Sequence, residues 1–80
     1  MARILIVDDS IIMRNVIKDI LRESEHVIAG EAPNASEAMR LFESERPDLT
    51  LLDIILPGDS GLDVLKKIRE SDPKARVLVI

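Results

Sequence analysis

The hydrophobic residues of this chain gather in four short runs, separated by longer segments in which they recur every three or four positions. Each run is apolar on both alternating faces, which is typical of strands buried inside a parallel sheet. The runs span residues 4–7, 27–29, 49–52 and 77–80. The pattern therefore predicts four fully buried strands.

The first segment between runs predicts an amphipathic helix. Its apolar residues follow helical spacing, and Arg14, Lys18 and Arg22 mark the face that we expect to meet water. The positions predicted to face the core are Ile12, Met13, Val16, Ile17, Ile20 and Leu21.

Two more helices follow from the same spacing and from their end signals. Asn34 or Ser36 opens the second helix, and Ser60 or Gly61 opens the third, because short polar residues and glycine are favoured at helix starts. Both helices end ahead of a proline, since the residue before proline disfavours helical dihedrals. The core positions are Ala35, Ala38, Met39 and Phe42 in the second helix and Leu62, Leu65 and Ile68 in the third.

Strands and helices thus alternate along the whole chain. Consecutive βαβ units cross over right-handedly, which predicts an α/β fold with a doubly wound parallel sheet and helices on both faces. If the strand order is 2-1-3-4, the first and third strands are neighbours and lead to opposite faces.

Composition narrows the classes of function. Eighty residues with 46% apolar and 32% charged residues and a net charge of -4 describe one domain, residues 1–80, with a single core. The absence of cysteine excludes thiol chemistry and favours a cytoplasmic location. The acidic balance and the single aromatic residue argue against a nucleic-acid partner. No apolar run approaches the roughly 18 residues of a membrane span, and the start lacks the features of a secretory signal.

Three acidic residues stand at the ends of predicted strands. Asp8 and Asp9 follow the first run, and Asp53 follows the third. Open α/β sheets bind ligands at the carboxyl ends of their strands, so in the order 2-1-3-4 these acids should converge. Clustered carboxylates repel one another unless a cation neutralises them, and oxygen ligands with room for water suit Mg²⁺ better than zinc. The pattern predicts a magnesium site.

Asp53 is the candidate nucleophile at this site. Carboxylates form aspartyl-phosphates, and a metal ion screens the charge of an incoming phosphoryl group, so metal-assisted phosphoryl transfer fits the three acids. Asp9 or Ser10 could instead simply cap the first helix. Capping explains Asp53 poorly, because the next helix begins several residues later. The turn of Gly30, Glu31, Pro33 and Asn34 at the same edge is interpreted as purely structural.

With these residues in view, the chain resembles the receiver (CheY-like) domain of two-component response regulators over all 80 residues. Residues 4–10 are similar to the first strand and acidic pair of that family, and Asp53-x-x-x-Pro57-x-x-x-Gly61 is similar to its phosphorylation-site loop. The resemblance implies a flavodoxin-like fold and phosphorylation of Asp53 by a histidine kinase. It also implies that Asp8, Asp9, Asp53 and the backbone carbonyl of Ile55 hold Mg²⁺.

The chain departs from the family at its carboxyl end. Receiver domains carry a Ser or Thr past the fourth strand and a Lys at the end of a fifth strand, and this sequence stops at Ile80. The fifth strand and the last two helices are therefore expected to be missing, with impaired switching as a result. Residues 77–80 would form an open edge, which predicts self-association, most simply as a homodimer.

Other functions fit less well. A magnesium-dependent phosphatase with an aspartate nucleophile needs a general acid two residues later, where this chain has Ile55. A nucleotide-binding fold needs a glycine-rich motif after the first strand, which is missing. We therefore expect a phosphoacceptor that is not an enzyme beyond its own phosphorylation and dephosphorylation. The alternative is a truncated receiver that acts only as a self-associating structural module.

Overall fold

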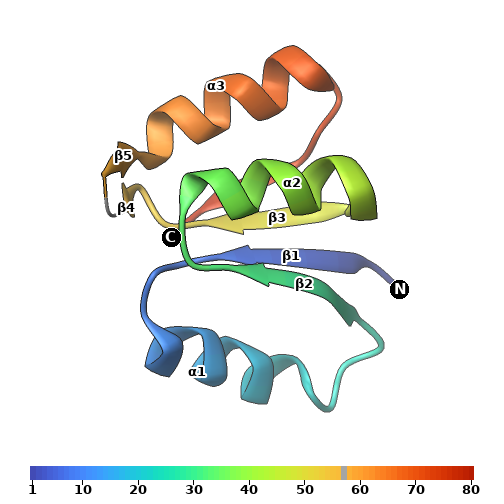
Figure 1. Ribbon diagram of the computed structural model, residues 1–80. Helices are drawn as coiled ribbons and strands as arrows, with labels where there is room; N and C mark the ends of the chain where they lie inside the picture. The colour runs from blue at the N-terminus through green and yellow to red at the C-terminus, as the bar shows by residue number, and fades with distance from the viewer. Residues whose placement is uncertain (57) are drawn as a thin grey trace.

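The computed structural model describes residues 1–56 and 58–80; Pro57, predicted to shape the loop after Asp53, lies outside them. Strands and helices alternate along the chain (Figure 1). In order, the elements are β1 (Arg3–Val7), α1 (Ile11–Leu21), β2 (Val27–Ala32), α2 (Ala35–Glu45), β3 (Leu49–Leu52), β4 (Ile55–Leu56), β5 (Asp59–Ser60), α3 (Gly61–Ser71) and β6 (Val77–Val79).

The main sheet has the order β2-β1-β3-β6, and all of its strand pairs are parallel. Because β6 is the fourth predicted strand, the predicted order 2-1-3-4 and the α/β class are confirmed. Val7, the last residue of β1, pairs with Ala32 on one side and with Leu52 on the other. The three strands therefore end together, at the edge where the acids follow.

Helices cover both faces of the sheet, as predicted: α1 lies on one face, and α2 and α3 lie on the other (Figure 1). Side chains alternate along β1, so Ile4 and Ile6 pack toward α1 while Leu5 and Val7 pack toward α2 and α3. The cluster on the α1 side is small and consists of Ile4, Ile6 and Ile17. The larger cluster consists of Leu5, Val7, Ala32, Ala35, Ala38, Phe42, Leu52, Leu56, Val64 and Ile68. Across the described residues, no helix is both long and apolar enough to cross a membrane.

The prediction for the first helix was wrong in its orientation. Of the six positions predicted to face the core, Ile17 is buried and Leu21 packs partly against the sheet, whereas the rest are exposed. A helix that lies on a sheet buries only one stripe, and the apolar residues of α1 occupy more than one. Arg14 and Lys18, predicted to meet water, are instead half-buried against β2. The exposed apolar positions are Ile12, Met13, Val16 and Ile20.

The strands also differ from the prediction in length and burial. β2 continues through Gly30 and Glu31, which we interpreted as a turn, because their pairing with β1 runs on to its last residue. The prediction of four fully buried strands holds only for residues 4–7 of β1. β2 is exposed at Val27 and half-buried up to Glu31, β3 alternates between half-buried and buried residues, and β6 is half-buried to exposed. Within the described sheet, β6 pairs with β3 on one side and forms the edge.

The helix starts match the predicted capping residues. Ser10, Asn34 and Ser60 are the N-caps, and each side chain accepts a hydrogen bond from a backbone N–H in the first turn. These bonds satisfy donors that have no partner inside the helix. α2 ends at Glu45, two residues before a proline, and α3 ends at Ser71.

The segment after β3, predicted as a loop, contains a short hairpin. β4 and β5 are antiparallel, with Ile55 opposite Ser60, and Gly58 has a φ of 73°, a backbone conformation that favours glycine. The N–H of Gly61 donates to the carbonyl of Ile54 at 2.6 Å. The start of α3 is thereby tied to the backbone that leaves β3.

Candidate metal centre

Ladder hydrogen bonds fix the backbone of two acids at the carboxyl edge of the sheet. The N–H of Asp8 donates to the carbonyl of Ala32 at 3.0 Å, and the N–H of Asp53 donates to the carbonyl of Val7 at 2.9 Å. These bonds extend the pairing of β1 with β2 and with β3 by one residue. Asp8 and Asp53 are therefore held on neighbouring strands, side by side.

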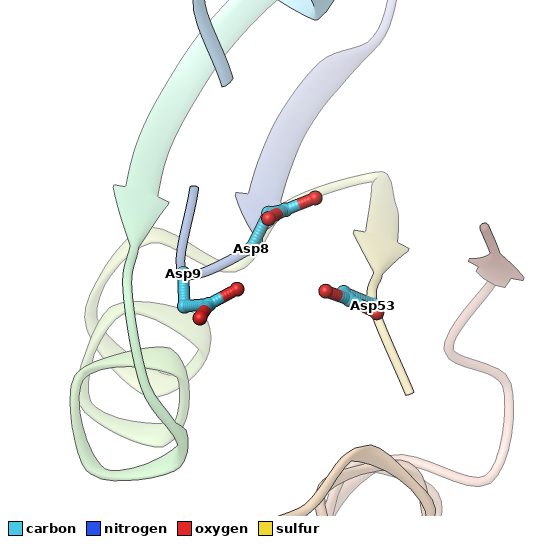
Figure 2. A group of neighbouring side chains, drawn as sticks. All are labelled: Asp8, Asp9 and Asp53. Atoms are coloured by element: carbon cyan, nitrogen blue, oxygen red, sulfur yellow. The ribbon is translucent and has the colours of Figure 1, made fainter. Parts of the chain in front are cut away.

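The side chains of Asp8, Asp9 and Asp53 converge, as predicted. One carboxylate oxygen of each lies within 4.8 Å of the others, and Figure 2 shows the three groups around a shared space beyond the strand ends. Asp8 is buried with 4% of its surface exposed, Asp53 is half-buried and Asp9 is exposed. The site therefore combines one buried acid with two that solvent reaches.

Two backbone donors orient the carboxylates. The N–H of Ser10 donates to Oδ1 of Asp8 at 2.9 Å, and the N–H of Ile55 donates to Oδ1 of Asp53 at 3.0 Å. Each acid thus bonds to the residue two positions later, which is a common turn geometry for aspartate. The turn after each strand sets the direction of its own carboxylate.

Ser10, and not Asp9, caps the first helix. Oγ of Ser10 accepts the N–H of Met13 at 3.2 Å, so Ser10 is the N-cap of α1. Capping therefore does not account for Asp9, which reaches the same space as the other two acids.

The donor set fits a hard divalent cation. Three carboxylates share a small volume, and bringing such charges together, with one of them buried, is costly without a counter-charge. Oxygen ligands and an open side with room for water are what Mg²⁺ requires. The carbonyl of Ile55 as a further ligand stays a prediction; its N–H is engaged with Asp53, and its side chain is 80% exposed.

The sequence reasoning missed a charged group beside the acids. Nη1 of Arg14 donates to the carbonyl of Asp8 at 2.6 Å, and Nε of the same side chain donates to Glu31 at 3.2 Å. Lys18 donates to the other carboxylate oxygen of Glu31 at 2.9 Å. These contacts lower the pKa of Glu31 below its ordinary value of 4.5, and the hydrogen bond from Lys18 is the largest cause. Two basic residues four apart on one helix, followed by a glutamate on the next strand, were the available signal.

The fold and the acids define an α/β module with a cluster of carboxylates, fit to hold a cation, at the switch point of its sheet. Residues 4–80 match the model of the response regulator receiver domain, and the chain belongs to that family. Receiver domains are signalling modules, and the predicted resemblance is confirmed over nearly the whole chain.

Individual relatives agree with this assignment. The chain is 40% identical over 77 residues to the chemotaxis protein CheY of Thermotoga maritima. The matched stretch covers 96% of this chain and 64% of that protein. It is similar to the crystal structure of the response regulator TrrA of Thermotoga maritima in complex with Mg²⁺ and BeF, with a TM-score of 0.92, 40% identity and coverage of 99% of this chain and 68% of TrrA.

TrrA has also been solved in complex with the histidine kinase ThkA, and that structure matches with a TM-score of 0.87, 40% identity and coverage of 99% of this chain and 67% of the matched chain. This chain thus spans about two thirds of the length of such relatives, 64% for the chemotaxis protein.

Proposed function

We propose that this chain is a phosphoacceptor module in which Asp53 receives a phosphoryl group from a histidine kinase in a Mg²⁺-dependent step. The observation that carries the proposal is the convergence of Asp8, Asp9 and Asp53 within 4.8 Å at the carboxyl edge of the sheet. Membership of the receiver family supports it, as do the complexes of TrrA with Mg²⁺ and BeF and with a histidine kinase.

The proposed phosphoryl transfer needs only the phosphohistidine of the kinase and the carboxylate of Asp53 as reactants. A carboxylate oxygen of Asp53 forms a bond to phosphorus while the bond between phosphorus and the donor nitrogen breaks, and the departing imidazole keeps that electron pair. Because the N–H of Ile55 holds Oδ1 of Asp53, we assign bond formation to Oδ2. The phosphoryl group later leaves by slow hydrolysis, since the position two residues after Asp53 is apolar and offers no general acid or base.

Asp8, Asp9 and Asp53, with the carbonyl of Ile55, are the residues that we assign to hold Mg²⁺. The cation supplies a positive charge that offsets the repulsion between the acids and the incoming phosphoryl group. The buried position of Asp8 and its bond from Ser10 keep one ligand preorganised at the base of the pocket. All these residues lie within residues 1–80, so we propose that acceptance itself needs no other segment. We also propose a cytoplasmic location, because a chain without cysteine suits a reducing compartment.

The test is the intact mass of the protein after incubation with Mg²⁺ and acetyl phosphate, a small phosphodonor. We expect one phosphoryl adduct on the wild-type chain and none on Asp53→Asn or in the presence of a chelator. Asp63→Asn is the matched control, because Asp63 is an exposed aspartate in the first turn of α3, and this variant should be modified like wild type. A folded wild-type chain that stays unmodified would overturn the proposal.

A second candidate function is self-association of the 80-residue chain. Leu78, Val79 and Ile80 are all exposed, and in the described sheet β6 has a neighbour on one side. An apolar edge strand is a template for another strand, so we propose that a second copy pairs along β6.

A further inference from the structure

We propose that Arg14 is a positioning residue for the metal centre: held by Glu31, it fixes the turn that presents Asp8 and Asp9 to the cation. This inference rests on the proposed function, because it assigns a task in Mg²⁺ binding. Arg14 contacts neither the carboxylates of the pocket nor the reacting atoms in any hydrogen bond of the described structure, so it acts through the backbone.

The contacts of Arg14 join three elements. From α1, its guanidinium donates to the carbonyl of Asp8 after β1 and to Glu31 on β2. Its side chain is only 13% exposed, whereas Lys18 on the next turn is 35% exposed. A planar fork with fixed donor directions can serve both acceptors at once, which a lysine ammonium on a flexible stem does not reproduce.

The carbonyl of Asp8 is an effective place to hold the turn. It belongs to the same rigid peptide plane as the nitrogen and Cα of Asp9. A bond of 2.6 Å to this oxygen therefore sets the direction in which Asp9 leaves the strand. Asp9 is itself exposed, so packing contributes little to its orientation, and the backbone has to supply it.

Glu31 keeps the guanidinium in place from the far side. Its two carboxylate oxygens accept from Arg14 and Lys18, one each. Glu31 is charged at neutral pH, and the bonds from Lys18 and Arg14 lower its pKa further. Outer residues that orient metal ligands in this way commonly affect metal affinity strongly when they are changed.

Charge alone predicts the opposite effect, which makes the inference testable. A positive charge beside a cation site repels the cation, so on electrostatic grounds the loss of Arg14 would tighten Mg²⁺ binding, and Arg14→Lys would leave it unchanged. Positioning predicts that Arg14→Lys weakens binding although the charge is kept. For Arg14→Lys, therefore, charge alone predicts an unchanged Mg²⁺ affinity, and positioning predicts a weaker one.

The experiment is a titration of the 80-residue chain with Mg²⁺, followed by the NMR shifts of its backbone amides. We expect Arg14→Lys to weaken Mg²⁺ affinity by roughly tenfold. Arg22→Lys is the matched control, because Arg22 is the C-cap residue of the same helix and forms an exposed pair with Asp19, so the affinity of this variant should equal that of wild type. Glu31→Ala should weaken binding in the same direction and add little when combined with Arg14→Lys, since the two residues act as one unit.

The outcomes separate this inference from the proposed function. If the folded wild-type chain binds no Mg²⁺, the proposed function falls, and the role of Arg14 falls with it. If wild type binds and Arg14→Lys binds equally well, the positioning role is overturned while the metal centre stands. Should Arg14→Lys fail to fold, Glu31→Ala decides, and an affinity equal to that of wild type would overturn the inference.

Discussion

Gly61 shows how the size of one residue controls the position of Asp53. A Cβ atom at this position would collide with the backbone of Asp53 and Ile54, and the N–H of Gly61 already bonds to the carbonyl of Ile54. The reason for glycine is space, because the backbone of this residue does not need a left-handed conformation. Any side chain here has to push the turn after β3 away from α3.

We therefore expect Gly61→Ala to lower the free energy of unfolding by about 2 kcal/mol or more and to weaken Mg²⁺ binding. Urea unfolding followed by circular dichroism measures the first effect, and a Mg²⁺ titration measures the second. Gly58→Ala is the comparison, because a Cβ there meets nothing within 4 Å but the φ is 73°. That variant should cost about 1 kcal/mol and leave the affinity unchanged. Equal behaviour of the two variants would contradict this account.

The three acids were predictable because each follows directly from the order of strands. A residue after a buried parallel strand lies at the ligand edge, so Asp8, Asp9 and Asp53 needed only the strand ends and the sheet order. Arg14 and Glu31 were not predictable in this way. Their contact depends on which side of α1 faces β2, and that rotation is not encoded in the order of elements.

At the scale of elements, α1 carries two apolar stripes with four-residue spacing. Ile17 and Leu21 face the sheet, whereas Ile12, Val16 and Ile20 face outward. Both stripes satisfy the periodicity of an amphipathic helix, so the pattern predicts the helix but not its rotation. The contacts of Arg14 and Lys18 with Glu31 accompany the observed orientation.

The ion pairs between α1 and β2 predict a pH dependence. Because the pKa of Glu31 is lowered in the folded chain, its contribution to stability is present above the ordinary value of 4.5 and is lost as the pH falls through the folded pKa. Wild type should exceed Glu31→Gln in free energy of unfolding at neutral pH, by less than about 1 kcal/mol because the pair is partly exposed. Urea unfolding at about pH 7 and about pH 3 should show this difference shrinking at the lower pH. A difference of the same size at both pH values would contradict the assignment.

At the scale of the whole molecule, the proposed self-association depends on the edge of the sheet that β6 forms. Leu78 is 54% exposed on β6, and a lysine in its place would put a charge on the edge that a second copy has to cover. We expect the mass of wild type by light scattering to rise with concentration and that of Leu78→Lys to stay monomeric. Leu62→Lys is the control, because Leu62, which the spacing predicted to face the core, is instead 50% exposed on α3. This variant should associate like wild type. A wild-type mass that stays monomeric at every concentration would exclude pairing through β6.

The two faces of the sheet differ in how firmly their helices are held. α1 contributes Ile17, its one buried residue, to a cluster with Ile4 and Ile6 of β1, while α2 and α3 share the larger cluster. Local unfolding begins where few apolar contacts must break, so the amide hydrogens of α1 should exchange with solvent sooner than those of α2. The acid turn is joined to the start of α1, and each opening of this helix releases the bond from Arg14 to Asp8. A ligand that binds only the closed form makes such openings rarer. A cation bound at the three acids would therefore slow the exchange of amide hydrogens along α1, rather than along the strands that carry the acids.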